Sequence, residues 1–331
     1  MKTIGCWLCL VGLAACSAAT KSPAGEQPAD HSDATDSKEV KAPDIQAAAN
    51  DGAIRAPLDA TPSPEGKRVY YTAFKRGDDG EDVPGVFGVA ADGGGTIDTL
   101  AAGGPLATPV GIAVSLDGTR LFVADVAAGS AARGAVLTLP SAGGDAVPVS
   151  GTEGYAPKGL AIAKRDGQEY LYFTGHDPES EAAGLFRVAA DGGVVTTLAS
   201  GAPLNDPSGV AISAKGDAYV VEAAVDSHAA RVLRWKDGKL QGFLEDIAIG
   251  FPAGITLTRD DATLLVSGLD PNTKHDVVYS VNVANGELSR LTKTIGAFSE
   301  PAGLHRAHEA DVFAWADSEA NASGTVYVLK F

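Results

Sequence analysis

Three acidic residues hold the same place in alternate copies of a repeated sequence pattern. Each ends a short run of apolar residues: Asp125 follows Leu-Phe-Val-Ala, Glu222 follows Ala-Tyr-Val-Val, and Asp317 follows Phe-Ala-Trp-Ala. The other copies carry small residues there, namely Ala73, Gly175 and Gly268. Converging carboxylates are the hard oxygen ligands that Ca²⁺ and Mg²⁺ prefer, and they can also exchange protons with a small substrate. The pattern therefore predicts a divalent-metal site formed by Asp125, Glu222 and Asp317.

Two further residues break the repeat at positions that would face the same space. Asp59 stands where the other copies have Gly111, Gly159, Gly209, Gly254 and Gly303. Two residues further along, His305 aligns with Thr61, Ala113, Ala161, Ala211 and Thr256, so it is the one imidazole at that position. Places where a local rule is broken are where function is expected. We predict that Asp59 and His305 bind a ligand.

A structural alternative exists for each of these acids. A carboxylate after a strand can accept hydrogen bonds from the backbone of its own turn, and the three repeated acids would then be turn caps. The first copy of the pattern could also tolerate Asp59 as a coil residue. A zinc spacing of His and Cys, a Ser-His-Asp arrangement and a phosphate-binding glycine motif are absent from the sequence.

The elements that must position these residues follow from the repeat itself. The phrase Pro-x-Gly-Ile-Ala-Val and its variants return roughly every fifty residues. A β-rich run follows each phrase, then a third apolar run, then a turn such as Asp191-Gly192, which permits the positive φ of a tight hairpin. This predicts an all-β fold over residues 43–331: a six-bladed β-propeller of four-stranded antiparallel blades. The last repeat ends after its third strand, so we expect residues 43–50 to pair with residues 325–331 and close the ring.

These phrases resemble NHL-type and gluconolactonase/regucalcin-like six-bladed propellers over residues 43–331. The gluconolactonase resemblance implies a metal site made by a glutamate, two asparagines at strand starts and an aspartate at the end of a second strand. Asp125, Glu222 or Asp317 matches that aspartate. The asparagines are absent, because the residues before the repeated glycines are Val110, Lys158, Ser208, Ala253 and Ala302.

The first sixteen residues direct the chain to the cell envelope. Lys2, a short apolar run and the small residues Ala14 and Ala15 predict a signal peptide over residues 1–15. Leu13-Ala-Ala-Cys16 resembles the bacterial lipobox, which implies a lipoprotein with palmitate-type acyl chains on Cys16. Ser17 follows the cysteine instead of an aspartate, which by the same resemblance implies the outer membrane. Residues 16–42 are rich in small and charged residues, so they predict a disordered tether.

Charge and motifs limit the classes of function that this protein can have. The formal net charge is −16, and a strongly acidic surface repels nucleic acid. Cys16 is the one cysteine beyond residue 15, so the propeller has no thiol chemistry. A regular repeat without a complete catalytic set predicts a non-enzymatic binding or scaffold module for a protein or small ligand at the central mouth. The alternative is a Ca²⁺- or Mg²⁺-dependent hydrolase or lactonase that uses the axial acids.

Overall fold

A computed structural model describes residues 43–331 apart from residues 51, 53, 130, 224–228, 249–253, 271, 274 and 292–300. The chain divides into two units, Met1–Val40 and Lys41–Phe331, and all described residues belong to the second unit. The signal peptide, Cys16 and the tether lie outside the described residues. Among the residues that are described, no helix has the length and hydropathy to cross a membrane.

Four separate sheets of four strands each cover the middle of the chain. In every sheet the strands pair antiparallel in sequence order. The first two sheets consist of β6 (Pro109–Val114), β7 (Arg120–Asp125), β8 (Ala135–Pro140) and β9 (Val147–Pro148), then β10 (Leu160–Arg165), β11 (Gln168–His176), β12 (Ala183–Ala189) and β13 (Thr196–Ser200). The next two consist of β14 (Pro207–Ile212), β15 (Ala218–Ala223), β16 (Ala229–Lys236) and β17 (Lys239–Ala248), then β18 (Ile255–Leu257), β19 (Thr263–Leu269), β20 (Asp276–Asn282) and β21 (Leu288–Arg290).

The two ends of the described chain form one sheet of eight strands in the order β1-β24-β23-β22-β2-β3-β4-β5. Its strands are β1 (Asp44–Ala49), β2 (Ile54–Pro62), β3 (Arg68–Arg76), β4 (Asp82–Ala90), β5 (Asp98–Ala102), β22 (Pro301–Arg306), β23 (Val312–Asp317) and β24 (Thr325–Lys330), with a short 3₁₀ turn at Ala320–Ala322. We expected six separate four-stranded sheets, and the structure has four. The difference arises because β2 and β22 pair in parallel at Asp59–Gly303 and Ala60–Leu304, which joins the first five and the last three strands into one sheet.

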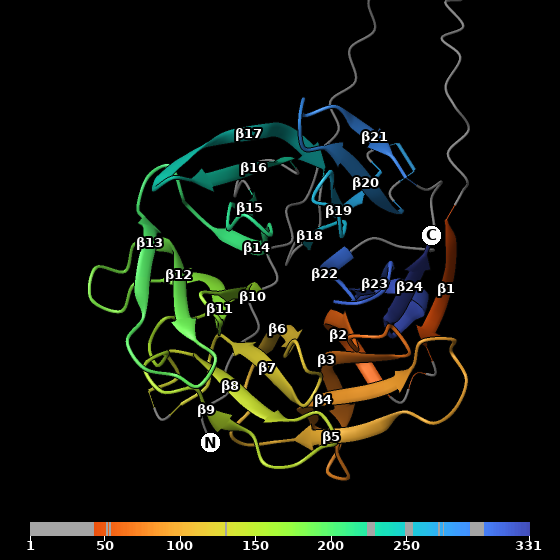
Figure 1. The fold of residues 1–331 in the computed structure, drawn as a ribbon. Coiled ribbons are helices and arrows are strands. Elements are labelled where there is room, and N and C mark those ends of the chain that lie inside the picture. The colour runs from red at the N-terminus through yellow and green to blue at the C-terminus, as the bar shows by residue number, and fades with distance from the viewer. Residues whose placement is uncertain are drawn as a thin grey trace, which may run out of the picture. The chain divides into compact units, whose positions relative to one another are not determined.

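The sheets surround a common centre, as in a β-propeller (Figure 1). The innermost strands contact one another in a closed circle that runs β2, β6, β10, β14, β18, β22 and back to β2. Buried apolar side chains fill the space between the faces of neighbouring sheets; Phe122, Phe173 and Phe186 belong to one such cluster. β2, β6, β10, β14, β18 and β22 therefore line the centre, and the residues that begin and end these strands define its two ends.

The N-terminal strand pairs with the C-terminal strand as the sequence predicted. β1 lies antiparallel to β24, with Asp44 opposite Lys330 and Ala47 opposite Tyr327. A register shift between Ala47 and Ala49 interrupts the ladder. The pairing covers one edge of β24 and so removes an unpaired sheet edge, which would otherwise invite aggregation.

Candidate functional site

Two adjoining cavities lie along the innermost strands. We call the smaller one, at the starts of these strands, the mouth cavity; its volume is about 10 Å³. We call the larger one, toward their ends, the basal cavity; its volume is about 70 Å³. His305, Val210 and Ile255 line both. The mouth cavity is also lined by Asp59, Val110, Lys158, Gly159, Leu160, Ser208, Gly209, Gly254, Gly303 and Leu304. The basal cavity is also lined by Thr61, Ala113, Val114, Ala161, Ile162, Ala211, Ile212, Thr256, Leu257, Arg306 and His308.

The repeated glycines sit where neighbouring innermost strands approach most closely. A Cβ at Gly111 would lie 2.1 Å from the carbonyl oxygen of Lys158, and one at Gly254 would lie 2.1 Å from the amide nitrogen of Leu304. These distances are too short for any side chain. At Gly303 the obstacle would be the Asp59 carboxylate, 1.8 Å away. The glycine at position 303 therefore leaves the room that Asp59 occupies.

Asp59 is buried and joins three innermost strands. Its Oδ1 accepts a hydrogen bond from Ala60 N at 2.8 Å, within β2. Its Oδ2 accepts one from Ile112 N of β6 at 2.8 Å, and lies 2.9 Å from His305 Nε2 of β22. The predicted pair of Asp59 and His305 is thus brought together at the centre of the propeller.

The contacts of Asp59 fix the role of the imidazole. A carboxylate oxygen can only accept, so Nε2 of His305 carries the hydrogen and donates it to Asp59. Nδ1 then accepts when the ring is neutral and becomes a second donor when the ring is protonated. His305 lines both cavities, and its side chain is 15% exposed, so a ligand in either cavity can reach the ring. This pairing can orient an imidazole for binding or for proton exchange.

Asp125 connects the turn after its own strand to the loop before β6. Its Oδ2 accepts a hydrogen bond from Ala107 N at 2.7 Å, and its Oδ1 accepts from Thr108 N at 2.9 Å and Ala127 N at 3.0 Å. The residue is fully buried. A carboxylate surrounded by backbone N–H groups has the partners of a turn cap.

Glu222 and Asp317 make local contacts of the same kind. Glu222 accepts from Asn205 N at 2.7 Å and pairs with Arg231 at 2.9 Å. Asp317 accepts from Glu319 N at 2.8 Å and from Ala320 N at 2.7 Å, at the 3₁₀ turn. The structure does not bring Asp125, Glu222 and Asp317 together, and among the described residues no group of three His, Cys, Asp or Glu side chains could hold a metal ion. Asp317 caps its own turn, as the structural alternative expects, whereas Asp125 also bonds the loop before β6, and Glu222 bonds the loop before β14 and Arg231.

The basal cavity contains polar residues that the sequence reasoning did not single out. Nε2 of His308 donates to the carbonyl oxygen of Val114 at 3.0 Å, reaching from the loop after β22 to the end of β6. Burial lowers the pKa of His308, and nearby Arg306 and His305 lower it further, although the bond to Val114 and the carboxylate of Glu169 act in the opposite direction. His308 lies three residues after His305 in the sequence, but no repeat position marks it as facing the centre.

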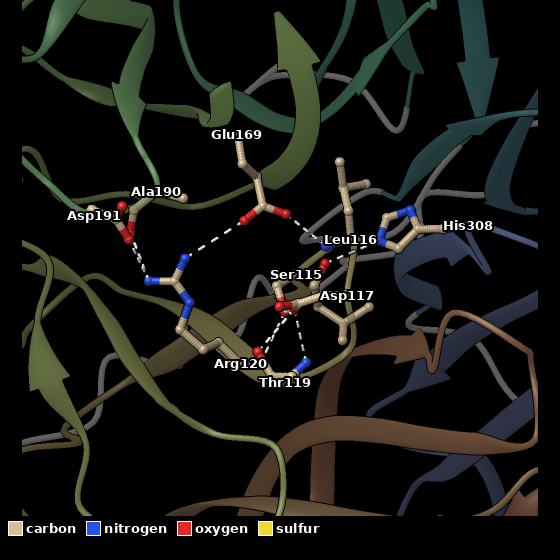
Figure 2. A network of polar contacts seen from close by, with 10 residues as sticks. Ser115, Leu116, Asp117, Thr119, Arg120, Glu169, Ala190, Asp191 and His308 are labelled. Atoms are coloured by element: carbon tan, nitrogen blue, oxygen red, sulfur yellow. Dashed lines mark hydrogen bonds and ion pairs between the residues drawn. The ribbon is translucent and has the colours of Figure 1, made fainter. Parts of the chain in front are cut away.

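A network of polar contacts lies around the loop between β6 and β7, with His308 at its edge (Figure 2). Glu169 of β11 accepts from Leu116 N at 2.6 Å and lies 3.6 Å from Arg120, which also pairs with Asp191 at 2.9 Å. This network links the loop between β6 and β7 to the next sheet. It gives the Glu169 carboxylate both a cation and a backbone N–H as partners.

Comparison with known proteins supports the fold class. No protein-family model matches the sequence, and no curated protein matches it. A gluconolactonase from Xanthomonas campestris has a similar structure, with a TM-score of 0.56 and 19% identity over 87% of this chain and 89% of that one. The crystal structure of a nidogen/laminin complex contains a chain with a TM-score of 0.55 and 19% identity over 76% of this chain and 84% of that one.

TolB from Acinetobacter baumannii is also similar, with a TM-score of 0.53 and 11% identity. The match covers 74% of this chain but 56% of that one. Identities this low show a shared fold and not a shared activity. The class that the fold defines is an all-β propeller with gluconolactonase-like and TolB-like structural neighbours.

Proposed function

We propose that this chain is a non-enzymatic binding or scaffold propeller whose ligand or protein partner binds at the central mouth. The observation that supports the proposal is that the three repeated acids already have partners: Asp125 and Asp317 accept hydrogen bonds from backbone N–H groups, and Glu222 accepts from Asn205 N and pairs with Arg231. At the centre, the buried carboxylate of Asp59 pairs with His305, whose side chain is partly exposed. A metal-dependent hydrolase or lactonase would need the acids as ligands, so it is the alternative that experiment must exclude.

We also propose that the eight-stranded sheet comprises two blades, which gives a ring of six. The support is the parallel junction of β2 and β22, which involves two residue pairs, whereas the strands on either side of it form regular antiparallel groups of four. In this arrangement β1 supplies the outer strand of the last blade.

We further propose that Cys16 carries the acyl chains of an outer-membrane lipoprotein and that residues 16–42 tether the propeller to the membrane. Acyl chains contribute about 0.8 kcal/mol per buried CH₂, so more than one chain anchors stably. Changing Cys16→Ser should move the protein from the membrane to the soluble fraction and abolish labelling by a palmitate analogue. A variant that stays membrane-bound would contradict this proposal.

Two measurements test the binding function. First, the full-length chain is assayed with gluconolactone in the presence of Ca²⁺ or Mg²⁺; we expect no hydrolysis above the uncatalysed rate. Metal-dependent turnover that Asp125→Asn abolishes would establish the hydrolase alternative instead.

Second, a photo-reactive residue is placed in living cells at Val110, which lines the mouth cavity, or at Val194, which is 91% exposed on the turn between β12 and β13. We expect a discrete cross-linked product from position 110 and none from position 194. Equal labelling from both positions, or none from position 110, would contradict binding at the mouth.

A further inference from the structure

Among the described residues, the basal cavity is lined by nitrogen-bearing side chains and by no carboxylate. Its titratable lining residues are His305, Arg306 and His308, and its other side chains are aliphatic apart from Thr61 and Thr256. The chain as a whole contains 42 acidic and 26 basic residues. A basic cavity within such an acidic protein concentrates positive potential where low-dielectric walls strengthen it.

The carboxylates nearest to these imidazoles already have partners. Asp59 binds His305 and the amide of Ile112, and Glu169 binds Arg120 and the amide of Leu116. Arg120 offsets the charge of Glu169, and the charge of Asp59 acts on His305, which leaves Arg306 as the cation of the cavity.

Arg306 is held by carbonyl oxygens. Its Nε donates to Leu257 O at 2.8 Å and its Nη1 to Ala307 O at 2.6 Å. Burial lowers the pKa of Arg306; Asp311 and Asp261 raise it and Arg259 lowers it by smaller amounts, and none of these three lines the cavity. The guanidinium is thus fixed in position beside the cavity, and its charge and remaining N–H groups are available to an anion.

We propose that the basal cavity binds a small oxyanion, of the phosphate or carboxylate class, through Arg306, His305 and His308. This inference rests on the proposed binding function and names a ligand chemistry for it at the basal end of the channel. A cavity of about 70 Å³ holds several water-sized groups, since one water requires roughly 10–15 Å³ by the same measure. It is smaller than the roughly 300 Å³ and more of sites for drug-sized ligands, so the ligand is a small ion or a terminal anionic group.

Proton uptake accompanies anion binding at this site. His308 donates through Nε2 to Val114, so Nδ1 can face an anion as a donor only when the ring is protonated. Burial together with Arg306 and His305 disfavours that protonation, and a bound negative charge favours it. Binding and protonation therefore reinforce each other, and the anion binds more tightly as the pH falls.

Isothermal titration of the full-length chain in detergent tests the proposal. Sulfate is the probe for the phosphate class because its charge is constant between about pH 8 and about pH 5.5, and acetate is the probe for the carboxylate class. At constant ionic strength we expect one of them to bind, and to bind about tenfold more tightly per pH unit for each proton taken up. Binding of sulfate alone assigns the site to phosphate groups, and binding of acetate alone assigns it to carboxylates.

Substitutions locate the binding. His308→Gln keeps an amide that can donate to Val114 and should weaken binding and reduce its pH dependence. Arg306→Gln should abolish binding, with circular dichroism confirming the fold. His176→Gln is the matched control, because His176 at the end of β11 does not line the basal cavity and its pKa is also lowered by burial. If Arg306→Gln fails to fold, the binding measured for His308→Gln alone decides whether the proposal stands.

The proposal is overturned if neither anion binds at the lower pH, or if His308→Gln binds as tightly as the unchanged chain and with the same pH dependence. This failure is distinguishable from failure of the binding function. A metal-dependent hydrolase would be detected through Asp125 in the lactone assay, whatever the anion titration shows.

Discussion

Asp59 connects residues that are far apart in the sequence and adjacent at the centre of the propeller. Its carboxylate binds the imidazole of His305 and the amide of Ile112, which belong to the strands on either side of β2. A buried carboxylate with these partners is stable, but removing it leaves a half-buried imidazole and a buried amide without an acceptor. The residue that breaks the glycine repeat is therefore both a structural junction and the acidic member of the candidate site.

We expect Asp59→Ala to lower the free energy of unfolding by about 3 kcal/mol, because it breaks a buried, hydrogen-bonded pair. Urea denaturation measures the change. Asp117→Ala is the control, since Asp117 is an exposed turn acid whose partners Ser115 and Thr119 are local. In a double-mutant cycle with His305→Ala, the two losses should not add. Additive losses would mean that the pair does not interact.

His308 makes stability depend on pH in the absence of a ligand. Its pKa in the folded protein lies below the ordinary value of 6.5, so the unfolded chain binds a proton more readily. This contribution to stability is complete above pH 6.5 and is lost as the pH falls from 6.5 through the folded pKa. We expect His308→Gln to flatten the loss of stability below pH 6.5, measured by urea denaturation at several pH values. An unchanged slope would contradict the buried, neutral state of this ring.

At the scale of elements, the innermost strands depend on glycines that allow backbones to approach. Gly111 faces the carbonyl of Lys158 across the boundary between two sheets. Because the obstacle is backbone and not the end of a flexible side chain, neither neighbour can move aside without shifting a strand. The glycine repeat is therefore a packing requirement of the ring as well as a feature of its sequence.

Gly111→Ala should destabilise the protein by about 1–3 kcal/mol, as overpacking of a tight contact does. Gly242→Ala in β17 is the matched control, because the nearest obstacle to its Cβ is the flexible side chain of Glu245 at 3.1 Å. There we expect little change in the melting temperature. Equal effects of the two substitutions would show that close approach at the centre is not what requires glycine.

The sequence predicted the elements better than the site. Repeated phrases located the strands, and the expected turn at Asp191-Gly192 has a positive φ, 87°, at Gly192 but not at Asp191. Asp59 and His305 were found because each breaks a repeat. The repeat gives the same alignment of Asp125, Glu222 and Asp317 whether their side chains face the centre or the nearby backbone. The sequence alone therefore could not decide between a metal site and structural hydrogen bonds to the backbone. His308 escaped prediction because its contact with Val114 joins a loop to a distant strand.

At the scale of the whole molecule, the N-terminal strand completes the last group of strands. β1 pairs along β24, and Ala48 is buried in the adjoining core. This pairing therefore joins the first and the last strand of the propeller, which lie at opposite ends of its sequence. Stability should depend on this strand and not on the tether before it.

Deleting residues 43–50 should lower the melting temperature clearly, because it removes the partner of β24 and exposes an unpaired edge. Deleting residues 17–40 should change it little, because we expect that stretch to be a tether. Calorimetry of both variants measures the difference. Equal losses would contradict closure by the N-terminal strand.

The most direct test of the central claim is calcium binding, measured by calorimetry on the full-length chain. The claim is that backbone N–H groups and Arg231 occupy the carboxylates of Asp125, Glu222 and Asp317, and that the chain binds its ligand at the central mouth. We predict no stoichiometric heat of Ca²⁺ binding, and no chelator-reversible rise in melting temperature beyond that caused by sodium chloride at the same ionic strength. A stoichiometric Ca²⁺ site that is lost in Asp125→Asn or Glu222→Gln would contradict the account and establish the metal-dependent alternative.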